Sequence, residues 1–139
     1  MVSTQHKLSK LEVTELFYNI SARISYAMCS MYDPEVNDEF IYNMLYSALY
    51  EITELLLRQK GRTPPRELRY RLYQVRDLYG SSYIPTKCFI FAQPGVHIYR
   101  DEMAEVGQIL ERWWERERKN YLWIVQHVSV DPSLIGYVG

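Results

Sequence analysis

The sequence is short of the residues from which most catalytic and metal sites are built. Its six glycines are scattered and form neither GxGxxG nor GxxxxGK, the loops that cradle phosphate groups. The three histidines, His6, His97 and His127, lie far apart and next to no cysteine, so no zinc site is predicted. The two cysteines, Cys29 and Cys88, are also far apart, which favours buried free thiols over a disulfide. We therefore expect no enzymatic activity, no metal or other cofactor, and no small-molecule substrate.

Long apolar runs are also missing. No run approaches the roughly 20 residues that a membrane-spanning helix needs. The N-terminal segment MVSTQHKLSK has no apolar stretch behind its charges, so we expect no signal peptide. With 139 residues, 47% of them hydrophobic and 24% charged, the sequence predicts a single domain spanning 1–139. Thirteen tyrosines stand out, and Tyr42, Tyr46 and Tyr50 form a stripe at helical spacing.

The spacing of the apolar residues predicts four helices. A capping box at Ser9–Glu12 marks the start of the first helix, and Asp33-Pro34 breaks it. Gly61 is placed to close the second helix. Thr63 is placed to cap the third helix, with Pro64 in its first turn. The predicted helices span residues 9–31, 37–59, 63–80 and 101–126.

The apolar pattern changes between residues 81 and 99. Segments 87–92 and 96–99 flank the turn sequence Gln93-Pro94-Gly95, which predicts a short hairpin. The predicted fold is mostly α. It is a four-helix bundle-like domain with a short β-hairpin between the third and fourth helices, followed by an apolar C-terminal tail, 128–139.

Positive charge is concentrated between Arg58 and Arg76. This stretch holds seven basic residues against one acid, Glu67, which leaves nine basic and sixteen acidic residues for the rest of the chain. A concentrated positive field attracts polyanions, and the planar fork of arginine suits phosphate. Two interpretations remain open: a solvated helix face, or a nucleic-acid-binding surface with interleaved aromatic rings. The second interpretation assigns binding to Arg58, Lys60, Arg62, Arg66, Arg69, Tyr70, Arg71, Tyr73 and Arg76.

Part of this stretch resembles a segment of known coat proteins. Lys60-Gly61-Arg62-Thr63-Pro64, followed by Arg69-Tyr70, is similar to the basic Lys-Gly-Arg-Thr-Pro…Arg-Tyr segment in coat proteins of rod-shaped and filamentous archaeal viruses. Those proteins are small helical subunits that wrap double-stranded DNA inside a filament. The resemblance implies that Lys60, Arg62 and Arg69 face the DNA backbone. In that family the segment lies near the N-terminus, whereas here it follows two predicted helices.

The C-terminal tail offers a second feature expected of a coat subunit. It contains the apolar residues Leu134, Ile135, Tyr137 and Val138, which is unusual for a chain end. Leaving them in water is unfavourable by ~25 cal/mol per Å² of apolar surface. We therefore predict that they pack on a neighbouring subunit, either another copy of this chain or a related second coat subunit. A tail folded back on its own core is the alternative.

The second predicted helix resembles a different family. Its sequence from Phe40 to Gly61, with an aromatic-rich start and a Leu-Leu-x-x-x-Gly end, is similar to the second helix of HEPN domains, small helical bundles of toxin–antitoxin and defence systems. Catalytic members carry an arginine followed four to six residues later by a histidine. No histidine here has an arginine at that distance, and Arg116 with Tyr121 is the nearest pattern. The resemblance thus implies a domain without a complete RNase motif.

The leading hypothesis is a structural subunit that oligomerises around DNA, most simply double-stranded DNA in a filamentous virion. Its mechanism would be sequence-independent neutralisation of phosphates. The net charge of −1 argues against a free monomer that seeks out DNA and agrees better with an assembly. The alternatives are a cytoplasmic HEPN-like domain that acts through protein contacts, and a small helical subunit of another nucleoprotein complex. The sequence does not distinguish DNA from RNA as the partner.

Overall fold

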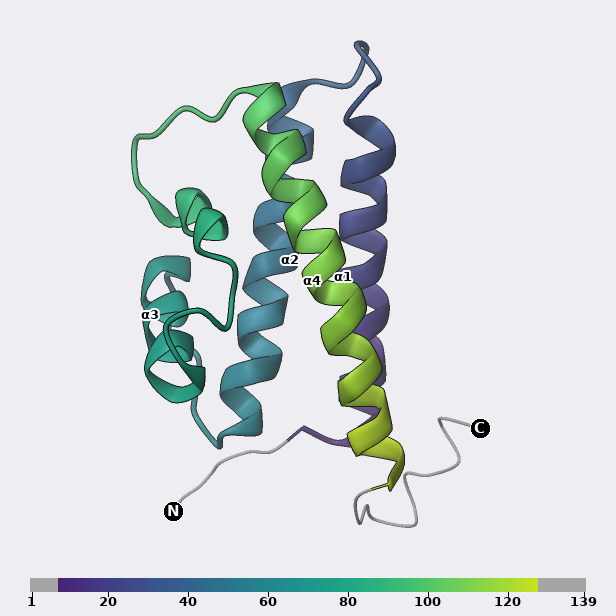
Figure 1. The fold of residues 1–139 in the computed structure, drawn as a ribbon, viewed down its shortest axis with the longest axis vertical. Helices are drawn as coiled ribbons and strands as arrows, with labels where there is room; N and C mark the ends of the chain where they lie inside the picture. The colour runs from purple at the N-terminus through teal and green to yellow at the C-terminus, as the bar shows by residue number, and fades with distance from the viewer. Residues whose placement is uncertain (1–7, 128–139) are drawn as a thin grey trace.

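Three long helices form the body of the protein, and two short helical elements pack on one side of it (Figure 1). The computed structural model describes residues 8–127, and only the backbone from residue 121 onward. The elements are α1 (Lys10–Ser30), α2 (Asp38–Gln59), α3 (Leu68–Tyr79), the 3-10 helix η1 (Thr86–Ala92) and α4 (Arg100–His127). The prediction of a mostly α fold is confirmed.

The starts of α1 and α2 are set by side-chain caps. Ser9 Oγ accepts a hydrogen bond from the Glu12 amide at 3.1 Å, and the Glu12 carboxylate accepts one from the Ser9 amide at 2.9 Å. The Asn37 side chain accepts a hydrogen bond from the Phe40 amide at 2.8 Å. Such bonds satisfy amides that have no partner within the first helical turn. The predicted capping box is confirmed.

The core lies where α1, α2 and α4 meet. α1 and α2 run side by side, and α4 lies across them in the view of Figure 1. Ile20, Leu45 and Leu110 are fully buried representatives of the three helices. Gly107 of α4 faces Met28 of α1, and a Cβ at this position would lie 2.7 Å from the methionine sulfur. The missing side chain lets the two helices approach closely.

The predicted β-hairpin is wrong, because residues 8–127 contain no strand. Residues 86–92 form η1, and residues 96–99 belong to no helix or strand. Cys88 and Phe91, the buried residues of η1, lie three positions apart, as the three-residue turn of a 3-10 helix requires. A short, continuous apolar run does not reveal its own period, so the sequence pattern was ambiguous here.

The start of α3 also differs from the prediction. The helix begins at Leu68 with Glu67 as N-cap, and not directly after Thr63. A proline disfavours the helical conformation of the residue before it, so Pro64 and Pro65 keep this segment irregular. The end of α3 is as predicted, at Gly80, whose φ is +112°. Arg62 and Arg66 therefore lie on a connecting segment and not on a helix.

The side layer of α3 and η1 positions the candidate site. Both elements lie on the side of α2 that faces away from α1 (Figure 1). Within residues 8–127, no helix carries an apolar stretch long enough to cross a membrane. The apolar tail, 128–139, lies outside the described residues, and with it the predicted interface residues Leu134, Ile135, Tyr137 and Val138.

Candidate nucleic-acid interface

A row of tyrosines runs along the side of α2 on which α3 and η1 lie, with Tyr42 against Phe91 of η1 and Tyr50 against Arg71 of α3. Tyr42, Tyr46 and Tyr50 stack in sequence, with ring centroids 5.9 Å and 6.2 Å apart, so the predicted stripe is confirmed. The Tyr50 hydroxyl donates a hydrogen bond to the Arg66 carbonyl at 2.7 Å. At the other end of α3, the Tyr79 hydroxyl donates one to the backbone of α2 at 2.8 Å. These bonds fix the segment before α3 and its last turn on α2.

Arg71 of α3 is buried between α3 and α2. It is only 5% exposed, and its guanidinium lies 3.6 Å from the centroid of the Tyr50 ring. It donates hydrogen bonds to the Tyr50 carbonyl at 3.1 Å, to the Glu54 carboxylate at 3.0 Å and to the Pro65 carbonyl. All of these contacts are internal to the fold. Arg71 therefore stabilises the fold, and its predicted role in nucleic-acid binding is corrected, because its guanidinium is buried and bonded within the protein.

Arg58 also has a partner within the fold. It forms an ion pair with Glu54, one turn earlier on α2. Glu54 thus contacts both Arg58 and Arg71. A carboxylate in direct contact compensates much of the field of an arginine. Arg58 is consequently a weaker candidate for phosphate binding than Lys60, Arg62, Arg66 and Arg76, which form no ion pair within residues 8–127.

The other basic side chains of the stretch lie at the surface. Three of them come from the segment between α2 and α3, and two come from α3 itself. Together with two exposed tyrosines they form the α3 basic surface, which consists of Lys60, Arg62, Arg66, Arg69, Tyr70, Tyr73 and Arg76. Glu67 and Asp77 are the exposed acids in the same region. Basic side chains thus outnumber acidic ones there.

Cations and tyrosine rings are paired on this surface. The Arg69 guanidinium lies 4.9 Å from the centroid of the Tyr70 ring, and the Arg76 guanidinium lies 5.0 Å from that of Tyr73. Such cation–π contacts support an arginine at the surface while most of its N–H donors stay open. Arg69 also donates a hydrogen bond to the Tyr70 hydroxyl at 3.1 Å. The predicted interleaving of arginine and tyrosine is therefore present as direct contacts.

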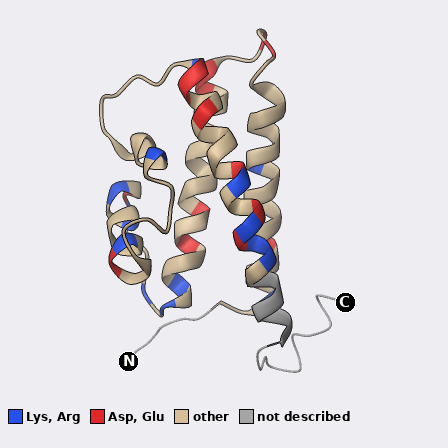
Figure 2. Ribbon diagram, viewed as in Figure 1, with Lys and Arg blue, Asp and Glu red and all other residues tan. Residues whose placement is uncertain are grey.

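Charge is divided along the molecule. Figure 2 shows acidic residues gathered at the end where α4 begins and where α1 connects to α2. Basic residues lie on α3, at the C-terminal end of α2 and on the later part of α4, where they alternate with acidic residues. The acidic end carries Asp33, Glu35, Asp38, Glu39, Asp101, Glu102 and Glu105. A polyanion is repelled by that end and attracted to the α3 basic surface.

No protein-family model, no curated protein and no solved structure matches this chain. Within residues 8–127, no group of three or more histidine, cysteine, aspartate or glutamate side chains is placed to hold a metal ion. Cys29 and Cys88 are both free thiols, as predicted, but only Cys88 is buried. Burial raises the pKa of Cys88 to about 12, so this thiol stays protonated at neutral pH.

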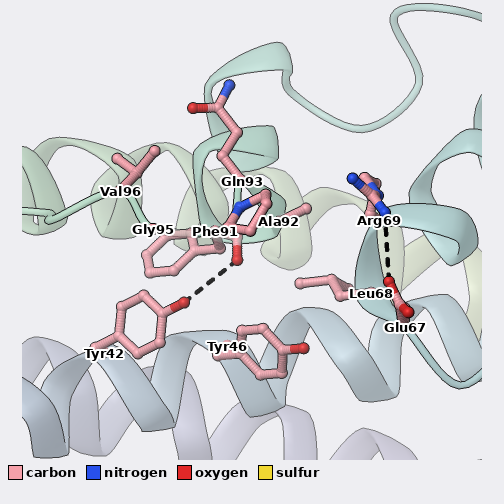
Figure 3. Close-up of a pocket in the computed structure, with 11 residues that line it drawn as sticks. Tyr42, Tyr46, Glu67, Leu68, Arg69, Phe91, Ala92, Gln93, Gly95 and Val96 are labelled. Carbon is pink, nitrogen blue, oxygen red and sulfur yellow. Dashed lines mark hydrogen bonds and ion pairs between the residues drawn. The ribbon is translucent and has the colours of Figure 1, made fainter.

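A hollow of about 310 Å³ opens beside the α3 basic surface (Figure 3). Its floor is made by Tyr42 and Tyr46, one wall by the start of α3 with Arg69, and the other wall by the segment that follows η1. The Tyr42 hydroxyl donates a hydrogen bond to the Phe91 carbonyl at 3.3 Å, which ties that segment to α2. The lining residues are Tyr42, Tyr46, Glu67, Leu68, Arg69, Phe91, Ala92, Gln93, Pro94, Gly95 and Val96.

Sequence reasoning missed this hollow. The tyrosine stripe and the Pro94-Gly95 turn were both visible as patterns, but they are far apart in the chain. Only the packing of α3 and η1 on the same side of α2 brings them together. The tyrosine stripe was the one local signal that pointed to the site.

Proposed function

We propose that this protein is a non-enzymatic structural subunit. It binds nucleic acid through the α3 basic surface, and its copies assemble along the nucleic acid. One observation carries the proposal: five basic side chains gather at the surface around α3, away from the acidic end of the molecule (Figure 2). Phosphate neutralisation by such a surface is independent of base sequence and depends strongly on salt. Arginine is suited to this role because its fork meets phosphate oxygens in pairs.

The tyrosines of the surface extend the proposed contact beyond charge. Tyr70 is 46% exposed and Tyr73 is 40% exposed, and each lies beside an arginine that would hold a phosphate. Their rings are placed to pack against sugars next to that phosphate. The resemblance of residues 60–70 to coat-protein segments supports double-stranded DNA as the partner. It also supports a filamentous virion as the location.

Assembly is the second half of the proposal. Neighbouring copies, or a related second subunit, would be held together by the apolar tail residues Leu134, Ile135, Tyr137 and Val138. A chain with a net charge of −1 has little long-range attraction to DNA as a monomer. An assembly multiplies the basic surface along one polyanion, and linked sites bind far more tightly than single ones.

Salt dependence of DNA binding tests the proposed surface. In the triple variant Arg62→Gln, Arg66→Gln, Arg76→Gln, the slope of log K against log salt concentration should flatten by roughly 2–3 units. Affinity should fall alike for all duplex sequences, because phosphates carry no sequence information. Fluorescence anisotropy with labelled duplexes at several salt concentrations measures both quantities.

The matched control removes three positive charges from α4. Arg112, Arg116 and Lys119 are exposed on that helix, away from α3, and their replacement by glutamine should change the slope much less. Equal salt-dependence slopes for the α3 variant and the wild-type protein would show that the basic stretch is a solvated helix face. Metal-independent cleavage of RNA that disappears in Arg116→Ala would instead favour an HEPN-like enzyme.

A further inference from the structure

We propose that the hollow beside α3 binds an unpaired nucleotide, with its base on the tyrosine floor and its phosphate on Arg69. This inference rests on the proposed function, because Arg69 belongs both to the α3 basic surface and to the hollow. It adds a binding site for one nucleotide and a preference for strands whose bases are accessible. The hollow's volume of about 310 Å³ is at the small end of ligand pockets, a size that suits one nucleotide better than several.

The floor supplies an aromatic surface with a free hydroxyl. The rings of Tyr42 and Tyr46 stack on each other, with centroids 5.9 Å apart and 28° between their planes, so the floor is aromatic over both side chains. The hydroxyls of Tyr42 and Tyr50 are bonded to carbonyls, at 3.3 Å and 2.7 Å. The Tyr46 hydroxyl between them has no hydrogen-bond partner among residues 8–127, and in Figure 3 it points toward the α3 side of the hollow. Aromatic side chains of this kind stack with any base.

The α3 wall supplies a positive charge at the rim. The Arg69 guanidinium forms an ion pair with the Glu67 carboxylate at 3.6 Å, a separation that is longer than a hydrogen bond. Besides the bond to the Tyr70 hydroxyl, it retains N–H donors for a phosphate. The Glu67 carboxylate at the same rim is an acceptor for an amino group of a base or for a sugar hydroxyl. The rim therefore carries one cation and one anion, which suits a polar ligand that has both a phosphate and hydrogen-bond donors.

The opposite wall supplies hydrogen-bond donors from the backbone. Gly95 and Val96 line the hollow, and their amide N–H groups donate to no acceptor within the described residues. The left-handed conformation of Gly95, with φ of +74°, keeps this turn open beside the floor. Ring nitrogens and carbonyl oxygens of bases are acceptors for such amides. Aromatic floor, cationic rim and free amides together match the parts of a nucleotide.

A base inside a duplex does not reach this hollow without leaving the stack, which costs free energy. We therefore expect duplexes to use the α3 basic surface alone, and single strands or strand ends to use the surface and the hollow. The test compares Tyr46→Phe, which keeps the ring and removes the free hydroxyl, with the wild-type protein. Tyr18→Phe is the control, because Tyr18 is 75% exposed on α1, far from the hollow.

Fluorescence anisotropy with a labelled oligothymidylate and with a duplex of equal length measures the two modes. Tyr46→Phe should weaken single-strand binding about three- to tenfold and leave duplex binding unchanged. Tyr18→Phe should change neither. Equal effects of Tyr46→Phe on both ligands, or no effect on the single strand, would overturn the site. Loss of duplex binding in the Arg62, Arg66, Arg76 triple variant reports separately on the proposed function.

Small ligands test the site without the rest of the strand. Thymidine 5′-monophosphate should shift the NMR amide signals of Gly95 and Val96 in the full-length protein. Arg69→Gln should weaken binding of the monophosphate about fivefold or more, but should leave binding of thymidine nearly unchanged. No shift at these amides, or an equal shift with inorganic phosphate alone, would reduce the hollow to a surface feature without a nucleotide site.

Discussion

Arg71 serves the fold, although it lies in the most basic stretch of the chain. Its guanidinium reaches α2 and the segment before α3 at once, through Tyr50, Glu54 and Pro65. Lysine keeps the charge but lacks the fork that makes these contacts together. We expect Arg71→Lys to lower the free energy of unfolding by about 2–4 kcal/mol, because buried acceptors lose their donor. Urea unfolding followed by circular dichroism measures this change.

The same substitution at Arg66 is the control for Arg71. The Arg66 side chain is exposed, and surface substitutions of this kind usually change stability by less than about 0.5 kcal/mol. A stability of Arg71→Lys equal to that of Arg66→Lys would show that the internal contacts of Arg71 contribute little.

Ionisation of Cys88 lowers the stability of the fold at alkaline pH. Burial raises its pKa to about 12 in the folded protein, from an ordinary value of 9.0. The unfolded chain therefore releases this proton at lower pH than the folded protein does. The contribution of the Cys88 thiol to the free energy of unfolding is fully present below about pH 9 and is lost as pH rises toward 12. Burial also raises the pKa of Tyr79 to about 12, which adds a loss in the same direction above its ordinary value of 10.0.

Replacing Cys88 by alanine isolates the contribution of the thiol. Between pH 9 and 10, the unfolding free energy of the wild-type protein should fall by up to about 1.4 kcal/mol per pH unit more than that of Cys88→Ala. Urea unfolding at a series of pH values gives these slopes. Cys29→Ala, which removes an exposed thiol, is the matched control. Identical slopes for Cys88→Ala and wild type would mean that the thiol ionises equally in both states.

At the scale of elements, α4 is joined to the α1–α2 connection by its first residue, Arg100. The guanidinium donates hydrogen bonds to the carbonyls of Met31 at 2.9 Å, Asp33 at 3.2 Å and Val36. It also forms an ion pair with Asp38 at 2.7 Å. The Met31 carbonyl lies at the C-terminal end of α1 and has no partner within that helix, so Arg100 satisfies a group that would otherwise depend on water. One side chain thus fixes the chain between α1 and α2 against α4.

Arg100→Gln should loosen this junction. We expect a loss of about 1–3 kcal/mol in the free energy of unfolding, together with faster hydrogen exchange at residues 32–37. Arg112→Gln on the same helix is the matched control, since Arg112 is exposed. Hydrogen exchange measured by mass spectrometry resolves the connection from the helices. Unchanged protection of residues 32–37 in Arg100→Gln would contradict this role.

Prediction of elements from the sequence succeeded where the determining interaction is local. Ser9 and Glu12 cap α1 through neighbours three residues apart, so their pattern alone identifies the helix start. η1 was missed because its helical turn depends on burying Cys88 and Phe91 against other elements. The late start of α3 follows from Pro64 and Pro65 together: a single proline suits the first turn of a helix, but the second keeps the residue before it out of the helical conformation.

At the scale of the whole molecule, the proposed assembly depends on the C-terminal tail. We expect deletion of residues 132–139 to abolish assembly on DNA, because Leu134, Ile135, Tyr137 and Val138 would no longer bury their apolar surface on a neighbour. Circular dichroism should show unchanged helix content. Light scattering and electron micrographs report the assembly, and filaments are expected with the full chain. A truncated chain that still forms the same filaments, or that loses its helices, would assign the tail to its own core.

The sequence by itself determined the three long helices and the concentration of positive charge between Arg58 and Arg76, because local spacing and composition carry both. It did not determine which of these charges face water. Arg71 and Arg76 lie on the same helix, yet packing on α2 buries the first and leaves the second exposed. The hollow at Tyr46 likewise exists only because α3 and the segment after η1 meet over α2. Exposure and cavities depend on contacts between distant segments, and those are decided by the tertiary structure.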